Sequence, residues 1–327
     1  MKIHPFWDPY PVVQTELGRA AELIDDTIKI PDPEVQKAIR EMLTESGGKM
    51  LRPAFCLLFA HYGREPLNEK IYALAASLEI LHNATLIHDD IVDESALRRG
   101  SPTIKNRFGN RIAVYAGDYL FAACFKLLAK YASTLKSVEM NTDSMEKILI
   151  GEIGQNEERF RLHQTIGDYL KNIQGKTAEL FALSCFLGAY ENDAPETIGK
   201  SARKIGENIG MAFQIVDDLL DYQETAAQIG KPVLEDVRQG VYSLPLLYAL
   251  DENPAALQPL LQKKEAITEN EAAQIARIIS TTTANERART LAKKYTDLAL
   301  AEIRKLPQNQ TTAILLDILP KILTRNY

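Results

Sequence analysis

This sequence has few cysteines and lacks long runs of basic or of apolar residues. Only three cysteines occur among the 327 residues, and Cys56, Cys124 and Cys185 lie far apart without metal-ligand spacing. An odd number of scattered cysteines does not build a disulfide framework. We therefore expect buried, reduced thiols that act as small apolar side chains, and a cytoplasmic protein.

Basic runs and long apolar runs are missing too. The net charge is −6 and no segment gathers cations against nucleic-acid phosphates, so nucleic acid is not an expected partner. No apolar run reaches the roughly 18 residues of a membrane span. The N-terminal segment MKIHPFWDPYPVV lacks the basic start and apolar stretch of a signal peptide. We expect no stable membrane insertion.

Strand patterns are absent as well, because no segment alternates convincingly between apolar and polar residues. Apolar residues instead recur at three- and four-residue spacing, which predicts helices over residues 13–28, 54–62, 71–92, 112–131, 145–160, 166–187, 198–220, 272–279, 287–303 and 313–323. Several helices between 71 and 220 are apolar on more than one face, as in the middle of a bundle. Because no linker divides the chain, we predict one all-α domain over residues 1–327.

The strongest functional signal is a pair of aspartate clusters of the form DDxxD, each at the C-terminal end of an apolar helical run. The clusters are Asp89, Asp90 and Asp93, and Asp217, Asp218 and Asp221. The outer aspartates of each cluster are four residues apart and share one helix face. Their mutual repulsion and the helix dipole are both unfavourable unless cations offset them. All-oxygen ligand sets suit magnesium, so we predict Mg²⁺ binding rather than a solvated acidic helix end.

Cationic residues near these clusters are candidates for binding phosphate groups. Lys49 and Arg52 follow two glycines and can converge on one phosphate from successive turns. Arg98 and Arg99 follow the first aspartate cluster, and in isolation such a pair is best explained as neutralising the aspartates. Lys176 and Lys231, in the segments GKT and GKP, complete the set.

These motifs together resemble the trans-polyprenyl diphosphate synthases, the polyprenyl synthetase family. The resemblance covers roughly residues 15–325 and is carried by GGKMLRP (47–53), LIHDDIVDESALRRG (86–100), GEIGQ (151–155), GKT (175–177), FQIVDDLLDY (213–222) and GKP (230–232). Two segments, ELILHNATLIHDD and NRIAVYAGDYLFA, are especially similar to the catalytic subunit of heptaprenyl diphosphate synthases.

The resemblance implies an isoprenoid-synthase-type helical bundle around a deep central cavity, usually in a homodimer. It implies isopentenyl diphosphate and an allylic diphosphate as substrates, with about three Mg²⁺ ions per site. The two aspartate clusters are expected to face each other across the cavity mouth. Asp89, Asp93 and Asp217 match the principal metal ligands, with Asp90 and Asp221 assisting.

Further residues match the family's substrate-binding positions. The resemblance assigns Arg98, Lys176 and Lys231 to the allylic diphosphate, and Lys49, Arg52, His82 and Arg99 to isopentenyl diphosphate. It places Thr177 and Gln214 near the reacting carbon. The implied chemistry is loss of diphosphate, attack on the allylic cation by the isopentenyl double bond, and loss of a proton. No nucleophilic side chain is required.

Product length is expected to depend on the helix before the first cluster. Thr85 and Ala84 lie one turn below Asp89, and both are small where family members with short products typically carry aromatic residues. Deeper positions are Leu81 and Leu78, with Cys124 or Leu128 facing them. We predict a hexaprenyl to octaprenyl product, with heptaprenyl as the best estimate. A farnesyl or geranylgeranyl product is the alternative.

Two departures and three alternatives remain open. Val241 replaces a lysine that many relatives have, and Leu234 replaces a frequent glycine. A class I terpene cyclase is disfavoured because it needs no second substrate site. A noncatalytic regulatory subunit is disfavoured because nearly all aspartates and cations are present. A chain active only with a small partner subunit is permitted by the heptaprenyl resemblance.

Overall fold

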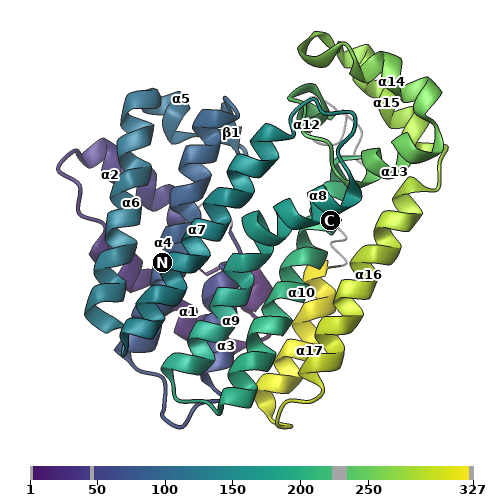
Figure 1. Ribbon diagram of the computed structural model, residues 1–327. Helices are drawn as coiled ribbons and strands as arrows, with labels where there is room; N and C mark the ends of the chain where they lie inside the picture. The colour runs from purple at the N-terminus through teal and green to yellow at the C-terminus, as the bar shows by residue number, and fades with distance from the viewer. Residues whose placement is uncertain (1–2, 45–47, 223–233, 324–327) are drawn as a thin grey trace. The chain divides into compact units, whose positions relative to one another are not determined.

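The computed structural model describes residues 3–44, 48–222 and 234–323 (Figure 1). The described residues are almost entirely helical, and their one β-ladder pairs β1 (Leu97–Arg98) with β2 (Ser101–Pro102) in antiparallel register. The prediction of an all-α fold is therefore confirmed. The chain forms two compact units. Unit 1 is Met1–Thr142, Leu180–Arg203 and Asn309–Ile314, and unit 2 is Asp143–Glu179, Lys204–Gln308 and Leu315–Tyr327.

Unit 1 is built on a buried central helix, α4 (Glu69–Val92), which is apolar on nearly every face. The other elements of this unit are η1 (Pro5–Trp7), α1 (Pro11–Thr27), α2 (Pro33–Thr44), α3 (Leu51–Ala60), α5 (Ile104–Phe108) and α6 (Asn110–Tyr131). Asn68 is the N-cap of α4, and its side chain accepts the N–H of Ile71 and caps the first turn. Helices α1, α3 and α6 all pack against α4, which explains its lack of a polar face.

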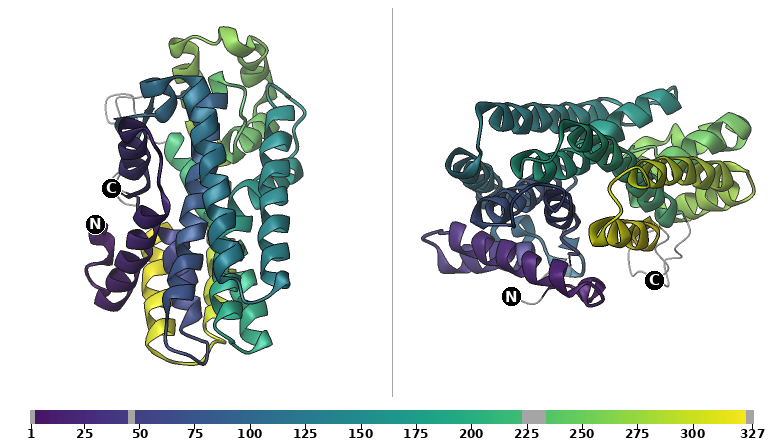
Figure 2. Two further views of the ribbon diagram at one scale, coloured as in Figure 1. Left: turned by 90° about the vertical axis from the view of Figure 1, so that its left-hand side faces the viewer. Right: turned by 90° about the horizontal axis from the view of Figure 1, so that it is seen from below.

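Helices α4 and α6 run antiparallel and side by side over most of their length (Figure 2). At one end the Tyr131 hydroxyl donates to the Glu69 carboxylate at 2.5 Å, and at the other His88 Nε2 lies 3.3 Å from Asp118. The His88 ring also stacks on Phe121 at 5.4 Å. Helix α6 thus packs along α4, whose C-terminal end carries the first aspartate cluster.

Unit 2 has its own apolar core. It contains α8 (Ile166–Ile173), the π-helical turn η2 (Gln174–Ala178), α12 (Glu235–Arg238), α13 (Leu244–Glu252), α14 (Pro254–Leu261), η3 (Lys264–Ala266), α15 (Glu269–Ser280) and α16 (Ala284–Ile303). Two capping boxes start helices here, Thr165 with Asp168 at α8 and Thr268 with Glu271 at α15. Leu246, Ile275 and other apolar residues of α13 to α16 form the fully buried centre.

Four further helices have residues in both units. They are α7 (Leu135–Glu157), α9 (Glu179–Glu191), α10 (Glu196–Asp221) and α17 (Gln310–Leu323). The predicted helix over 166–187 is wrong in one respect, because α8 and α9 are separated by the π-helical turn. Helices α2, α5, α12, α13 and α14 were not predicted individually. The three cysteines are buried and free, as the sequence predicted.

The expectation about membrane-spanning length needs a correction at α6. Among the described helices, α6 alone is long and apolar enough to cross a membrane by length and composition. Its apolar window contains a few polar residues, so counting uninterrupted apolar runs missed it. Within the protein 44% of this window is buried, as for a core helix that packs along α4. The remaining face is exposed.

Candidate active site

The first aspartate cluster ends α4 in unit 1. Asp93 is the C-cap residue, and its backbone N–H donates to the carbonyl of Asp89 at 2.8 Å. The side chains of Asp89 and Asp93 are partly exposed, whereas Asp90 is only 1% exposed. The cluster therefore presents its two outer carboxylates and buries the middle one.

Asp90 is held by Arg98. The Nε and Nη2 atoms of Arg98 donate to Asp90 Oδ1 at 3.0 and 2.8 Å. The chain turns after α4 at Glu94, which has positive φ, and the Ser95 N–H donates to the Asp90 carbonyl at 3.0 Å. Arg98 follows on β1, just before the hairpin turn at Arg99 and Gly100. Burial raises the pKa of Asp90, and the hydrogen bonds and charge of Arg98 oppose that rise. Arg98 therefore pairs with an aspartate, which is the role that the sequence favours for the arginine pair considered by itself.

Four residues that we predict to bind phosphate, three of them cationic and one neutral, lie in unit 1. The Arg99 side chain lies over Gly48, where a Cβ atom would be 2.6 Å from Arg99 Nη1. Arg52 and Arg99 are both close enough to His82 to depress its pKa. Lys49 directly follows Gly48. The structure therefore brings Lys49, Arg52, His82 and Arg99 to one region of unit 1.

Burial shapes the chemistry of this group. Burial lowers the pKa of Arg52 to about 10, with the Glu79 carboxylate acting in the opposite direction. The Arg52 guanidinium lies 4.6 Å from the centre of the Phe181 ring. Its buried Nε atom has no hydrogen-bond partner among the described residues, which leaves a donor that an anion can satisfy. Burial, followed by the neighbouring arginines, holds the pKa of His82 well below its usual value, so His82 is neutral at pH 7.

Glu79 is a site residue that the sequence reasoning missed. It is 6% exposed and accepts a hydrogen bond from Asn83 at 3.3 Å, one turn along α4. A lone carboxylate inside an apolar helical run must be paired, and this is the signal that would have found it. Its charge offsets those of the neighbouring Arg52 and Arg99.

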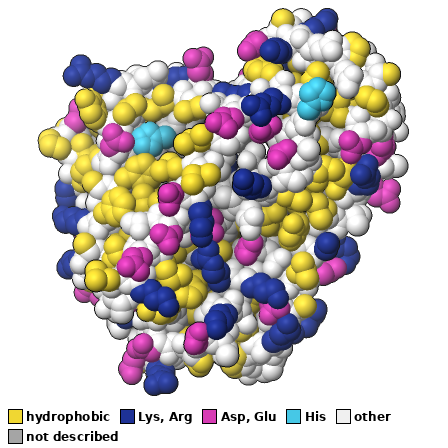
Figure 3. Space-filling model, viewed as in Figure 1, with side chains coloured by type: hydrophobic (Ala, Val, Ile, Leu, Met, Phe, Trp, Pro, Cys, Tyr) yellow, Lys and Arg dark blue, Asp and Glu magenta, His cyan; other side chains and the backbone are white. Residues whose placement is uncertain are grey.

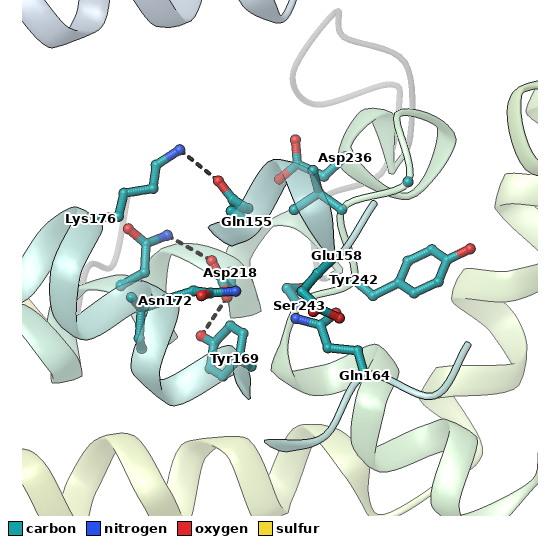
Figure 4. Close-up of a pocket in the computed structure, with 14 residues that line it drawn as sticks. Gln155, Glu158, Gln164, Tyr169, Asn172, Lys176, Asp218, Asp236, Tyr242 and Ser243 are labelled. Carbon is teal, nitrogen blue, oxygen red and sulfur yellow. Dashed lines mark hydrogen bonds between the residues drawn. The ribbon is translucent and has the colours of Figure 1, made fainter. Parts of the chain in front are cut away.

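The second aspartate cluster ends α10 in unit 2. Asp218 is 7% exposed and accepts hydrogen bonds from the Tyr169 hydroxyl at 2.6 Å and from Gln214 Nε2 at 2.8 Å (Figure 4). Burial raises the pKa of Asp218 to about 7, against the lowering effect of these two hydrogen bonds. Asp217 is partly exposed and Asp221 is exposed. The middle aspartate is again buried and the outer two are presented.

Lys176 and Thr177 lie on the π-helical turn. Such turns are rare and occur frequently at functional sites. Thr177 Oγ1 donates to Gln214 Oε1 at 2.7 Å, which links the turn to Asp218 through Gln214. Lys176 Nζ lies 2.8 Å from Gln155 Oε1 and 2.9 Å from Glu152 Oε2. The structure therefore joins the predicted residues Lys176, Thr177 and Gln214 to the second cluster.

A pocket of about 100 Å³ adjoins this network and is lined by side chains of Tyr169, Lys176, Asp218 and Asp236 (Figure 4). Tyr169 and Asp236 were not predicted, because neither belongs to a recognised motif. Val241, which stands where a lysine is frequent, also lines the pocket. Leu234 has φ 53, a left-handed conformation that explains why glycine suits this position. Lys231 lies outside the described residues.

The aspartates of the two clusters are suited to Mg²⁺ that also binds a substrate phosphate. Across residues 3–44, 48–222 and 234–323, no three His, Cys, Asp or Glu side chains are grouped closely enough to hold a metal ion by themselves. Each cluster has two outer carboxylates that are at least partly exposed, whereas Asp90 and Asp218 are buried. Magnesium usually takes one or two carboxylates, substrate phosphates and water. The residues therefore fit Mg²⁺ that binds together with a diphosphate.

An all-helical fold with two aspartate-terminated helices and adjacent cations defines the isoprenoid-synthase class of enzymes. A sequence model of the polyprenyl synthetase family matches residues 33–280, and the chain belongs to this family. The protein is accordingly a prenyltransferase.

Three relatives illustrate the similarity. Heptaprenyl diphosphate synthase component 2 of Geobacillus stearothermophilus is 39% identical over 292 residues, covering 87% of this chain and 88% of that protein. Geranylgeranyl diphosphate synthase of Saccharolobus solfataricus is 37% identical over 287 residues, covering 83% and 84%. The crystal structure of geranylgeranyl pyrophosphate synthase from Lactobacillus brevis superposes with a TM-score of 0.93 at 38% identity, covering 98% and 99%.

Proposed function

We propose that this trans-prenyl diphosphate synthase extends an allylic diphosphate with isopentenyl diphosphate to a hexaprenyl to octaprenyl product, with heptaprenyl as the best estimate. One observation carries the reaction: each of two helices ends in an aspartate cluster whose middle member is buried and whose outer members are presented. The family match runs through both units, which supports one synthase domain. We also propose a cytoplasmic protein, since its three cysteines are buried and free.

Within this proposal the outer aspartates, Asp89, Asp93, Asp217 and Asp221, hold Mg²⁺ with the allylic diphosphate. The metal ions would neutralise charge on the diphosphate as it leaves. Asp90 and Asp218 position these ligands through Arg98, and through Tyr169 and Gln214.

The chain's own residues bind and orient the two substrates. Lys49, Arg52 and Arg99, with neutral His82 as a hydrogen-bonding partner, bind the diphosphate of isopentenyl diphosphate. Lys176 and Lys231 bind the allylic diphosphate, and Arg98 assists by fixing the first cluster. Thr177 and Gln214 are held by one hydrogen bond near the reacting carbon. Positioning and charge neutralisation account for the catalysis.

The product length rests on residues of α4 below the first cluster. Ala84 is fully buried and Thr85 is partly buried, and both are small. Leu78, Leu81, Cys124 and Leu128 are buried in the same unit, where α4 packs on α6. The heptaprenyl relative supports the longer product, and the geranylgeranyl relatives keep the shorter one as the alternative.

The assembly we propose is a homodimer formed through the exposed face of α6. Val114, Tyr115 and Phe125 lie on this face and are 40%, 62% and 40% exposed. Figure 3 shows hydrophobic side chains gathered over the region where α6 runs in Figure 1. A relative named component 2 favours the alternative of a heteromer with a small regulatory subunit. Light scattering of the wild type and of Tyr115→Lys distinguishes a dimer from a monomer.

The test of the function uses the purified chain, Mg²⁺, labelled isopentenyl diphosphate and farnesyl diphosphate. The expected result is a ladder of products ending at about thirty carbons or more, abolished by a chelator and restored by Mg²⁺. Arrest at about twenty carbons would keep the reaction and refute the product-length argument. No product with any primer, and activity only after a partner subunit is added, would establish the heteromer.

A further inference from the structure

The N-terminal segment before α1 packs against the loop that carries Lys49. Residues His4 to Trp7 lie outside the family match, which begins at residue 33. Trp7 belongs to the 3₁₀ turn η1 and is 0% exposed. The segment is anchored to the first turn of α1, since the Gln14 side chain donates to Asp8 at 2.7 Å. A fixed segment of this kind can orient what it touches.

Trp7 holds the backbone of Lys49. Its ring Nε1–H donates to the Lys49 carbonyl at 2.7 Å. The next residue, Met50, has φ 49, which is a costly left-handed conformation for a residue other than glycine. Met50 is the N-cap of α3, which begins at Leu51 and carries Arg52 as its second residue. The hydrogen bond from Trp7 therefore fixes the peptide that leads into the strained start of this helix.

Two neighbours of Trp7 act on the Lys49 side chain. The Lys49 ammonium lies 5.2 Å from the centre of the Phe6 ring, within cation–π range, and Phe6 contacts Trp7 edge to face at 4.9 Å. The His4 imidazole accepts the Phe6 N–H at 3.0 Å and lies close to both Lys49 and Arg99. The segment thus contacts Lys49 at its backbone and at its charged end.

We propose that Trp7 and Phe6 are positioning residues that set Lys49 for the diphosphate of isopentenyl diphosphate. The proposal rests on the proposed function, in which Lys49, Arg52 and Arg99 bind that group. It assigns a role to the segment MKIHPFWDPYPVV, whose aromatic residues belong to none of the family motifs quoted above. Neither residue is a chemical participant, since both act through Lys49.

The kinetic test compares Trp7→Phe and Phe6→Leu with the wild type. Trp7→Phe keeps an aromatic ring and removes only the N–H donor and part of the packing. The KM for isopentenyl diphosphate should rise about two- to tenfold, the range expected for one neutral hydrogen bond or cation–π contact. The KM for farnesyl diphosphate should change by less than about twofold. A generally loosened structure would instead raise both constants or lower kcat.

Tyr62→Phe is the matched control. It removes the hydroxyl of a buried tyrosine that bonds Thr312 at 2.6 Å, without touching Lys49. Its KM for isopentenyl diphosphate should equal that of the wild type. All variants are assayed below the onset of their thermal unfolding, followed by circular dichroism. A KM for isopentenyl diphosphate within twofold of wild type in both Trp7→Phe and Phe6→Leu would refute the proposal.

A binding experiment separates this inference from the proposed function. Trp7 is the only tryptophan in the sequence, so its fluorescence reports on the Lys49 loop. Titration with isopentenyl diphosphate should change the emission of the wild type, with the same Kd that calorimetry gives. The Lys49→Ala variant should bind isopentenyl diphosphate more weakly in both measurements. Binding detected by calorimetry without any change in emission would refute the role of Trp7 and leave the proposed function standing. No binding at all would refute both.

Discussion

Gly210 on α10 is the residue whose replacement should most sharply separate activity from stability. It packs against the π-helical turn that carries Lys176 and Thr177. A Cβ atom at Gly210 would lie 2.4 Å from Ala178 Cα and 2.9 Å from Ala178 Cβ. The first distance is more than 1 Å shorter than the ~3.5–4.0 Å separation of carbon atoms in contact. Because the contact is with backbone, Gly210→Ala must displace the turn.

Two opposing terms set the expected stability change. Alanine is favoured over glycine in a helix interior by about 1 kcal/mol. Overpacking of a well-filled site costs about 1–3 kcal/mol, and a rigid backbone neighbour favours the upper end. The net loss is about 1–2 kcal/mol, or a few degrees in Tm for a chain of this size. A displacement near 1 Å at positioning residues costs about 100-fold in rate, so kcat should fall about 10- to 100-fold.

Gly199→Ala on the same helix is the control. A Cβ there meets Phe186 Cε2 at 3.5 Å, an ordinary contact. This variant should keep wild-type kcat and unfold at the same or a slightly higher temperature. The assay is product formation at saturating substrates, with thermal unfolding measured on the same samples. Wild-type kcat in Gly210→Ala, or equal losses in both variants, would refute the argument that the turn requires this close approach.

Three further predictions concern product length, positioning and pH. Ala84→Phe should shorten the product ladder, and an unchanged ladder would contradict the proposed pocket below Asp89. Tyr169→Phe removes one donor to buried Asp218 and should lower kcat up to about tenfold with little change in either KM. The hydrogen bond from Lys263 and helix-capping contacts lower the pKa of Glu271 to about 2. Its stabilising effect is therefore present above its unfolded value near 4.5 and lost as pH falls toward 2, so Glu271→Gln should flatten the dependence of Tm on pH there.

Much of the fold followed from local pattern. The spacing of apolar residues predicted most helices of the bundle, because residues three and four apart lie on the same face of a helix. Its failure at 166–187 has a physical reason. A π-helical turn adds one residue to a helical turn without changing which residue types suit it, and here the turn packs closely against Gly210 at Ala178.

The candidate site divides in the same way. The aspartate clusters were predicted from their spacing at the ends of apolar helical runs. Lys49, Arg52, Arg99 and Lys176 were predicted from the resemblance of their motifs to the family. Sequence alone did not show that each cluster buries its middle aspartate. That depends on Arg98, which donates from the β1–β2 hairpin, and on Tyr169, which donates from another helix.

What the sequence determined by itself is thus the all-α class, the two aspartate clusters and the family, all of which are encoded in short segments. Only the tertiary structure decided which aspartates are presented, that Glu79 balances the charges of Arg52 and Arg99, and that Trp7 holds the Lys49 loop. These contacts join residues up to 49 positions apart in the chain, as between Tyr169 and Asp218. No local spacing encodes such pairs, since they exist only once apolar burial has packed the helices together.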